Sequence, residues 1–546
     1  MRLPLSLFVL VVAAIVGTWR WLGAPVRMPP SPLAATEKLY CVSYTPFRGA
    51  QSPLDPGTQI DPRQIEDDMA RLSRLTECVR TYSTRNGLDR VAEIAERYGV
   101  KVIQGIWLGG ERTAQERDIA TAVGIARRHP QTVRSVVVGN EVLLRGEMTP
   151  GELAATIRRV KAQIPQPVTY ADVWEFWLRH REVYAAVDFV TIHILPYWED
   201  FPIPARNAAA HVEDIRRKVA AAFADKEILL GETGWPSAGR MREGALPSPA
   251  NQARVLHDVL DTARREGYHA NLIEAFDQPW KRRLEGTVGG HWGLFDAERR
   301  EPKFRWGAPV SNHPRWRLQA AAGVALAALA FAAAWAARRR EEPLADIPPP
   351  IWLGIAATAL GCGILVGWAL ENVAIESLTA GDWLRSLTMA GLAVAAPLMG
   401  AAALVCGACV PPFARILGPV ALRPPGRLEL ALGVGLMVLC VVAVQVALGL
   451  VFDARYKDFP FAPLTAAAIP YLVLALIGPL APSAEERKLV GRRALAETMF
   501  AAVLGGSAVY IVLNESLANW QAVWLGAVFV TLAAVLLRVR DAQDSG

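Results

Sequence analysis

Long apolar stretches are the feature that most constrains how this 546-residue chain can fold. Seven of them follow one another in the C-terminal part, and each is close to the roughly 20 residues that an apolar helix needs to cross a bilayer. They cover about residues 317–337, 351–371, 387–410, 429–452, 463–482, 495–514 and 519–537. The pattern predicts an all-α, multi-span transmembrane region over residues 317–546.

A further apolar run, Leu3–Val16, follows a single arginine near the N-terminus and extends to about Leu22. Such a run is either a cleaved signal peptide or an uncleaved anchor. Trp19 and Trp21 flank it, and the sequence lacks a clear small-x-small cleavage site, which favours an anchor. We therefore predict a membrane anchor and linker over residues 1–37, and eight spans in total.

Basic residues between the apolar stretches predict the orientation, because short cytoplasmic loops are enriched in Lys and Arg. With a cytoplasmic N-terminus, the loops on that side hold Arg338, Arg339, Arg340, Arg415, Arg423, Arg427, Arg487, Lys488, Arg492, Arg493, Arg538 and Arg540. The loops on the other side of the same region hold only Arg385, Arg455 and Lys457. Both termini are therefore expected in the cytoplasm and residues 40–310 outside it, as in a bacterial inner-membrane protein with a periplasmic domain.

The net charge of +6 thus reflects membrane topology. A basic stripe interleaved with aromatic residues is missing, so no nucleic-acid partner is expected. Of six cysteines, Cys41 and Cys78 fall in the soluble part; a disulfide is possible there, but buried free thiols are favoured. Without a CxxC pair or a His/Cys cluster in that part, we expect no metal and no cofactor.

Between residues 38 and 307, apolar strand-like runs alternate with amphipathic helices. The predicted strands are Leu39–Tyr44, Cys78–Tyr82, Val100–Trp107, Ser135–Asn140, Val168–Tyr170, Phe189–Ile194, Ile228–Gly231 and Leu272–Phe276. A helix is predicted over Pro62–Leu75, and another begins at Thr149-Pro150, a capping residue followed by proline. Eight such repeats in about 270 residues are typical of a (β/α)8 TIM barrel. Residues 308–316 then form a linker to the membrane region.

Two of the predicted strands end in glycine and then, directly or one residue later, a glutamate: Glu141 and Glu232. Side chains at the carboxyl ends of barrel strands project into one mouth. Two carboxylates that approach within about 5–5.5 Å there can cleave a glycosidic bond with retention. Trp235, just after the second glutamate, offers a flat apolar face to a sugar ring. The pair predicts acid/base and nucleophilic cleavage of a glycoside.

The segments Val138-Gly-Asn-Glu141-Val-Leu and Leu230-Gly-Glu232-Thr-Gly-Trp235-Pro-Ser resemble the two catalytic signatures of glycoside hydrolase family 17. Those enzymes are retaining β-1,3-glucanases and β-glucan transglycosylases on a (β/α)8 barrel. The resemblance extends over about residues 38–307. It includes Arg80-Thr-Tyr82-Ser, Tyr170-Ala-Asp172-Val-Trp174, Pro196-Tyr197, Glu274-Ala-Phe-Asp277-Gln-Pro-Trp280-Lys281 and Trp292-Gly-Leu-Phe295.

The resemblance implies that Glu141 is the general acid/base, that Glu232 is the nucleophile, and that Asn140 binds the sugar 2-hydroxyl. Aromatic residues are expected either to line the mouth or to pack in the core: Tyr44, Tyr82 and Tyr197, with Trp174, Trp235 and Trp280 as candidates for stacking. Arg80 either orients Glu232 or satisfies another carboxylate. A supporting polar network is expected from Asp172, Glu274, Asp277, Lys281 and Glu285. Gln278 and Ile192-His193-Ile194 depart from the family pattern, which puts subsite specificity in doubt.

We therefore predict a membrane-bound retaining transglycosylase that acts on β-1,3-glucan outside the cytoplasm and forms β-1,6 linkages, with a glucan synthase as a partner. An endo-β-1,3-glucan hydrolase and a non-catalytic glucan-binding or export component remain alternatives. Short inside loops leave no room for a nucleotide-sugar transferase domain. Intramembrane polar residues are few, namely Gln445, Glu371, Asn372, Glu497 and Asn514.

Overall fold

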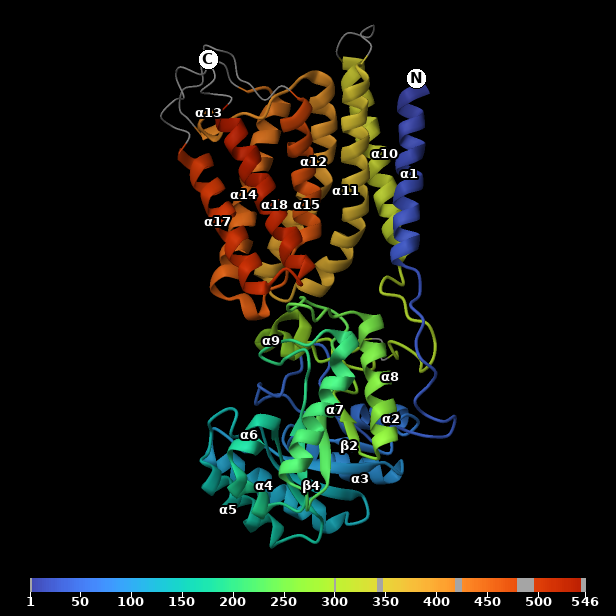
Figure 1. The fold of residues 1–546 in the computed structure, drawn as a ribbon, viewed down its shortest axis with the longest axis vertical. Helices are drawn as coiled ribbons and strands as arrows, with labels where there is room; N and C mark the ends of the chain where they lie inside the picture. The colour runs from blue at the N-terminus through green and yellow to red at the C-terminus, as the bar shows by residue number, and fades with distance from the viewer. Residues whose placement is uncertain (1, 299–300, 341–346, 418–424, 479–494, 542–546) are drawn as a thin grey trace. The chain divides into compact units, whose positions relative to one another are not determined.

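The computed structural model describes residues 2–298, 301–340, 347–417, 425–478 and 495–541. The chain forms two compact units, a barrel over Val26–Val310 and a helical unit made of Met1–Pro25 and Ser311–Gly546. Figure 1 shows both units, and each is described by itself.

Eight parallel strands close the barrel in chain order, with β8 paired to β1. They are β1 (Cys41–Ser43), β2 (Cys78–Arg80), β3 (Lys101–Ile106), β4 (Val133–Asn140), β5 (Val168–Val173), β6 (Val190–His193), β7 (Ile228–Thr233) and β8 (Ala270–Leu272). The predicted (β/α)8 barrel is confirmed. Almost every strand residue is buried, as expected for strands that are covered on both faces.

The helices around the strands begin where the sequence supplies caps. They are α2 (Pro62–Leu72), α3 (Val91–Arg97), α4 (Arg112–Arg128), α5 (Pro150–Lys161), α6 (Trp174–Arg179), α7 (Ala205–Ala222), α8 (Pro249–Glu266) and α9 (Arg282–Gly289), with 3-10 turns at Leu88–Arg90, Arg181–Ala186 and Pro279–Lys281. Thr149 and Glu152 form a capping box at α5, and Asp61 and Ser248 cap α2 and α8 in front of a proline. These capping residues determine where the helices begin, which hydrophobic periodicity alone does not.

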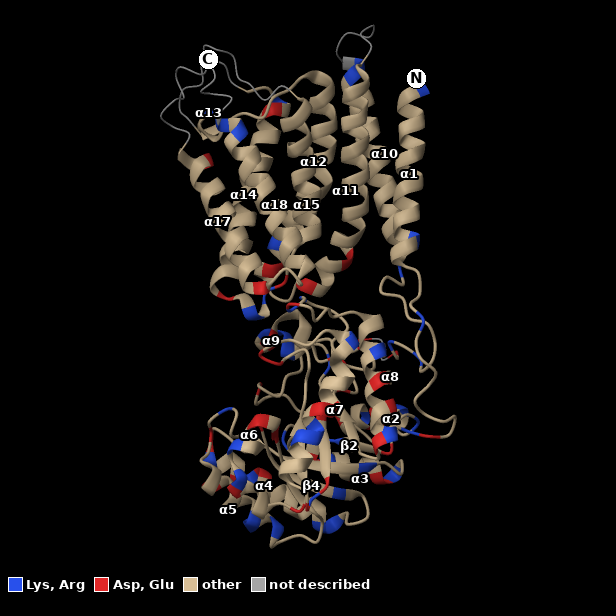
Figure 2. Ribbon diagram, viewed as in Figure 1, with Lys and Arg blue, Asp and Glu red and all other residues tan. Residues whose placement is uncertain are grey.

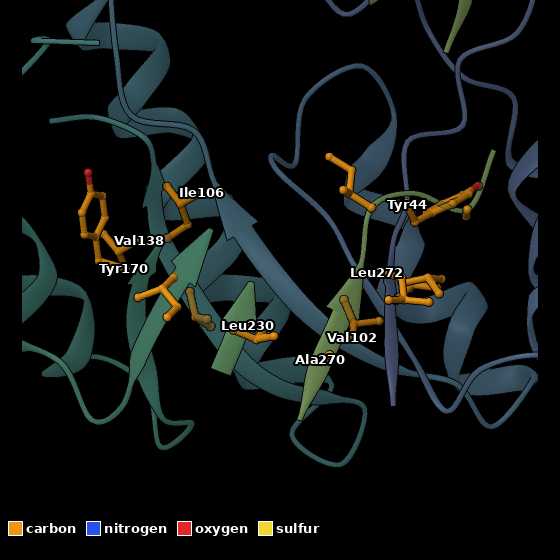
Figure 3. Close-up of a cluster of buried hydrophobic side chains, with 14 of the residues drawn as sticks. Tyr44, Val102, Ile106, Val138, Tyr170, Leu230, Ala270 and Leu272 are labelled. Atoms are coloured by element: carbon orange, nitrogen blue, oxygen red, sulfur yellow. The ribbon is translucent and has the colours of Figure 1, made fainter. Parts of the chain in front are cut away.

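Alternate residues of the strands pack into two different hydrophobic clusters. Side chains such as Val102, Leu230 and Leu272 pack in one cluster with residues of the surrounding helices, and Figure 3 shows part of that cluster. The residues one position away form a separate cluster of Cys41, Cys78, Ile103, Val137, Ala171 and Leu229. Because successive strand side chains point to opposite faces, this second cluster fills the barrel interior.

Cys41 and Cys78 are bonded to each other, so the expectation of free thiols is wrong. The register of the first two strands explains the pairing. Val42 lies opposite Val79, which places Cys41 beside Cys78 with both side chains in the interior cluster and their Cα atoms 4.4 Å apart. The sequence alone could not show this, because strand register is a property of the folded sheet.

Some element boundaries also differ from the prediction. The last strand was expected over Leu272–Phe276, but β8 ends at Leu272. Beyond it the backbone still bonds to both neighbours, Ile273 N–H to Thr233 O and Ala275 N–H to Ser43 O, without a regular ladder. Helix α2 ends at Leu72 rather than Leu75, because the chain tightens there into a turn in which Leu75 N–H donates to Leu72 O.

The helical unit contains α1 (Arg2–Leu22), α10 (Trp316–Arg340), α11 (Pro349–Glu376), α12 (Ala380–Cys406), α13 (Phe413–Leu417), α14 (Arg427–Phe452), α15 (Phe461–Ile477), α17 (Leu495–Glu515) and α18 (Trp520–Asp541), with a 3-10 turn at Ala454–Tyr456. Seven of these helices are long and apolar enough to cross a membrane, and α15, with 17 residues, is shorter. Each predicted apolar stretch overlaps one of these helices, but α12 ends at Cys406, before residue 410, and residues 479–482 of the stretch 463–482 lie outside the described residues. In Figure 2 the charged residues of this unit gather near the helix ends.

Candidate active site

Glu141 and Glu232 occupy the carboxyl ends of β4 and β7. Glu232 lies within β7 and is 5 % exposed, whereas the side chain of Glu141, one residue beyond β4, is 24 % exposed. The backbone at Glu141 has φ 53°, which a non-glycine residue rarely adopts, and it follows Gly139 at φ 89°. Glu141 N–H donates to Ala171 O at 2.8 Å and so holds this turn against β5.

His193, the last residue of β6, lies between the two glutamates. Its Nδ1 is 2.9 Å from Glu141 Oε1, and its Nε2 is 3.6 Å from Glu232 Oε1. One ligand atom from each of the three residues can be chosen so that all lie within 4.8 Å of one another. Two carboxylate oxygens that close fit the separation of a retaining glycosidase and not the wider separation of an inverting one.

The same three side chains are the group among the described residues that could hold a metal ion. A cation there would have to displace bonds that already exist. The guanidinium of Arg80 is hydrogen-bonded to Glu232 Oε1, and the imidazole of His193 is hydrogen-bonded to Glu141 Oε1. The arrangement is therefore better described as a hydrogen-bonded cluster.

Hydrogen-bond donors from β2 and from the segment just after it keep Glu232 in its ionised form. Arg80 Nη1 donates to Glu232 Oε1 at 2.9 Å, and the Tyr82 hydroxyl lies 2.8 Å from the same oxygen. Burial raises the pKa of Glu232, but the charges of His193, Arg80 and Lys281 outweigh it and leave the pKa below its ordinary value. Burial, and then the charge of Glu232, raise the pKa of Tyr82 well above its ordinary value, so this hydroxyl remains a donor.

Arg80 also connects β2 to two other strands. Its Nη1 donates to Gly231 O at 2.8 Å, and its Nη2 bonds to Asn140 Oδ1. Of the two uses left open for Arg80, the structure shows contact with Glu232. Asn140 is thereby fixed next to Glu141, with its side chain turned toward the guanidinium.

The expected supporting residues divide into two groups. Lys281 Nζ donates to Glu274 Oε1 at 2.9 Å, and burial raises the pKa of Glu274 to about 7 although Lys281 opposes the shift. Burial likewise raises the pKa of Glu285. Asp277 instead binds Lys303 Nζ at 2.6 Å and Gly293 N–H at 2.9 Å. Asp277 therefore organises the loop after β8 rather than the carboxylate pair.

Asp172, on β5, is buried and bonded to the Tyr170 hydroxyl and, at 2.7 Å, to Val173 N–H. Burial raises its pKa to about 6, which these hydrogen bonds only partly oppose. A nearby negative charge on Glu141 pushes the pKa of Asp172 in the same direction as burial. This carboxyl therefore changes its charge near pH 6.

The aromatic candidates separate by exposure. Tyr44, Tyr197 and Trp235 are fully buried: the Tyr44 hydroxyl bonds to Asp68, that of Tyr197 to Arg240 O, and the Trp235 indole N–H to Leu246 O. Their rings pack in the core. The rings of Trp174 and Trp280 are partly exposed, and the hydroxyl of Tyr82 is bonded to Glu232. Trp174 and Trp280 therefore remain the candidates for stacking on a sugar.

The sequence reasoning did not assign a role to His193, although it noted that Ile192-His193-Ile194 departs from the family pattern. Gly231 was a sequence signal that β6 packs closely against the strand of Glu232. A Cβ added to Gly231 would lie 2.4 Å from Thr191 Cγ2 and 3.3 Å from His193 Nε2, so this glycine makes room for β6 beside the nucleophile. Lys303 and His291, which pair with Asp277, were also missed because they lie outside the quoted motifs.

A closed parallel barrel with two close carboxylates at the carboxyl ends of β4 and β7 defines a glycoside hydrolase domain of the retaining class. Residues 41–293 match the family model of the BtgE/BtgC glycoside hydrolase domain. The chain is 26 % identical over 273 residues to a glucan 1,3-beta-glucosidase of Candida albicans, which covers 45 % of this chain and 87 % of the relative. It is 26 % identical over 263 residues to a glucan 1,3-beta-glucosidase of Saccharomyces cerevisiae, covering 44 % and 83 %.

Among solved structures, the family 17 beta-1,3-glucanosyltransferase from Rhizomucor miehei is similar, with 25 % identity and a TM-score of 0.44. The match covers 49 % of this chain and 97 % of that one.

We predict that Asp172→Asn changes how the stability of the barrel depends on pH. The folded pKa of about 6 lies above the ordinary value near 4, so Asp172 contributes stability that is present below about pH 4 and is lost as the pH rises through 6. The asparagine stays neutral. The unfolding midpoint of the variant, measured relative to wild type by scanning calorimetry between pH 4 and 7, should therefore rise by about 5 °C.

The matched control is Asp261→Asn on α8, where the carboxylate is 59 % exposed and bonds to Arg265. Its midpoint difference from wild type should change far less over the same range. A difference between Asp172→Asn and wild type that stays constant with pH would contradict the assignment.

Proposed function

We propose that this protein is a membrane-bound retaining transglycosylase that acts on β-1,3-glucan outside the cytoplasm. The observation that carries the proposal is the placement of the Glu141 and Glu232 carboxylate oxygens within 4.8 Å in unlike surroundings. Relatives named glucan 1,3-beta-glucosidase support a β-1,3-glucan as substrate. Residues 38–307 form the catalytic domain in this proposal, and residues 1–37, 308–316 and 317–546 are anchor, linker and spans.

The surroundings assign the roles. Glu232 is buried, and Arg80 and Tyr82 keep its carboxylate ionised, which suits a nucleophile. Glu141 is more exposed, which suits a group that exchanges protons with the substrate. In the first step Glu232 bonds to the anomeric carbon while Glu141 protonates the departing glycosidic oxygen. In the second step Glu141 takes the proton of an acceptor hydroxyl, whose oxygen attacks the same carbon and releases Glu232. Asn140 binds the 2-hydroxyl.

Esterification links the two steps electrostatically. Once Glu232 is an ester it carries no negative charge, so ionising Glu141 becomes easier at the moment when a base is needed. Water or a sugar hydroxyl can act as acceptor with the same groups. Transfer to a sugar, forming β-1,6 linkages, is our preferred outcome, because an enzyme held at the membrane meets nascent glucan from a synthase at high local concentration. Hydrolysis of β-1,3-glucan is the second candidate.

The membrane location rests on the apolar helices and on charge. Seven helices can cross a bilayer by length and composition. Basic residues concentrate between the spans on the side of the N-terminus, which favours the opposite side of the membrane for the barrel. The Cys41–Cys78 disulfide agrees with an oxidising compartment such as the periplasm.

The products formed by the full-length protein in detergent test the activity. We expect laminari-oligosaccharides to give products longer than the substrate, resolved by mass, with new linkages identified by methylation analysis. Glu232→Gln should lower the rate about 10⁴-fold or more, and Glu141→Gln about 10²–10⁴-fold. The control is Glu116→Gln on α4, where Glu116 forms an exposed ion pair with Arg159. This variant should retain the wild-type rate.

Only shorter products would establish the hydrolase instead. An inactive wild type that still binds laminarin would favour the non-catalytic glucan-binding component.

The two glutamates should also be distinguishable by the product they give with azide. With a dinitrophenyl β-laminaribioside, Glu141→Ala still forms the glycosyl-enzyme, because the leaving group needs no acid. Azide then attacks it, and two inversions give a β-azide. In Glu232→Ala the azide attacks the substrate directly, and one inversion gives an α-azide. Proton NMR of the azides identifies the anomer, and the reverse pairing would exchange the two roles.

The orientation can be tested with a phosphatase that is active only outside the cytoplasm. Fused after residue 310 it should be active, because the barrel is expected outside; fused after residue 340 it should be inactive. A cytoplasmic fluorescent reporter at the same positions provides the complementary control. Activity after residue 340 and none after residue 310 would invert the proposed topology.

A further inference from the structure

The imidazole of His193 is the group that touches both members of the carboxylate pair. It is 1 % exposed and sits at the end of β6, between the mouth-facing ends of β4 and β7. Its two nitrogens differ in their contacts. Nδ1 lies at hydrogen-bond distance, 2.9 Å, from Glu141 Oε1, but Nε2 is buried without a hydrogen-bond partner and is 3.6 Å from Glu232 Oε1.

We propose that His193 is a positioning residue that sets the position of the proton on Glu141. The inference rests on the proposed function, since it concerns the same two carboxylates. It adds a residue that the two catalytic signatures do not contain.

The distances favour one tautomer of the neutral ring. A proton on Nδ1 completes the short bond to Glu141 Oε1, whereas a proton on Nε2 would face an oxygen beyond normal hydrogen-bond length. With Nδ1–H donating to Oε1, the carboxylic proton of Glu141 belongs on Oε2. That oxygen is then the one free to protonate the glycosidic oxygen, so the histidine pre-orients the general acid.

Two substitutions separate positioning from general packing. Asparagine places an amide N–H near the position of Nδ1, and leucine removes the donor. We expect His193→Asn to keep activity on laminari-oligosaccharides within about tenfold of wild type. His193→Leu should lower kcat/KM on the same substrate about 10²-fold, because its general acid is no longer oriented.

The leaving group supplies a readout that a packing defect would not move. A dinitrophenyl β-laminaribioside needs no acid, so on it both variants should stay within about threefold of wild type. The full-length proteins are compared in detergent, with circular dichroism and unfolding midpoints as checks of folding.

His257→Asn is the matched control. His257 is another buried histidine of the barrel, on α8, with Nδ1 2.6 Å from Ala253 O and Nε2 accepting from Gly307 N–H. Its leaving-group dependence should equal that of wild type. The proposal is overturned if His193→Leu loses equally on both substrates, or if His193→Asn loses as much as His193→Leu on laminari-oligosaccharides. A wild type without turnover overturns the proposed function itself, which the Glu232→Gln comparison detects independently.

Discussion

A negative charge kept inside a closed barrel of apolar strands is the constraint on which the rest of the site depends. Glu232 is 5 % exposed, and an isolated carboxylate in such a place would take up a proton rather than stay charged. Arg80 supplies the compensating charge, and the loss of one partner of a buried pair costs about 3–5 kcal/mol. Arg80 itself needs acceptors, which it finds at Gly231 and Asn140. One guanidinium thus ties β2, β4 and β7 together across the barrel and fixes where the nucleophile lies.

The second carboxylate is less constrained. Glu141 contacts His193 but pairs with no guanidinium of the described residues, and its side chain is about a quarter exposed. In the proposed mechanism this group gains and loses a proton in every cycle, and the weaker hold leaves both of its charge states accessible. Its φ of 53° places the side chain at the strand end, where it can reach the mouth of the barrel. The unlike surroundings of two equal carboxyls are therefore the basis of their different roles.

The barrel and its carboxylate pair could be predicted because they depend on local patterns: apolar runs, caps, and a glutamate after glycine at a strand end. What could not be predicted depends on register and on side-chain direction. The Cys41–Cys78 bond follows from the pairing of Val42 with Val79, which has no signature in either strand alone. Trp235 carries the expected motif, yet its ring points into the core. His193 was visible only as a departure from a pattern, and its contacts with both glutamates emerge from the closure of β6 between β5 and β7.

The polar residues of the helical unit bear on whether its spans form a path or hold the enzyme at the membrane. Glu371 accepts from Gln319 and pairs with His313, and Glu497 accepts from Phe413 N–H at 2.7 Å. Each of these contacts joins a helix to a neighbouring segment, as expected of polar side chains that stabilise packing. Gln445 lines a cavity of about 220 Å³, together with Glu376, Arg385, Lys457 and Asp458, whose charges are of both signs. Side chains that are already engaged in packing favour the interpretation that this unit is a packed helical bundle and that these residues do not line a path.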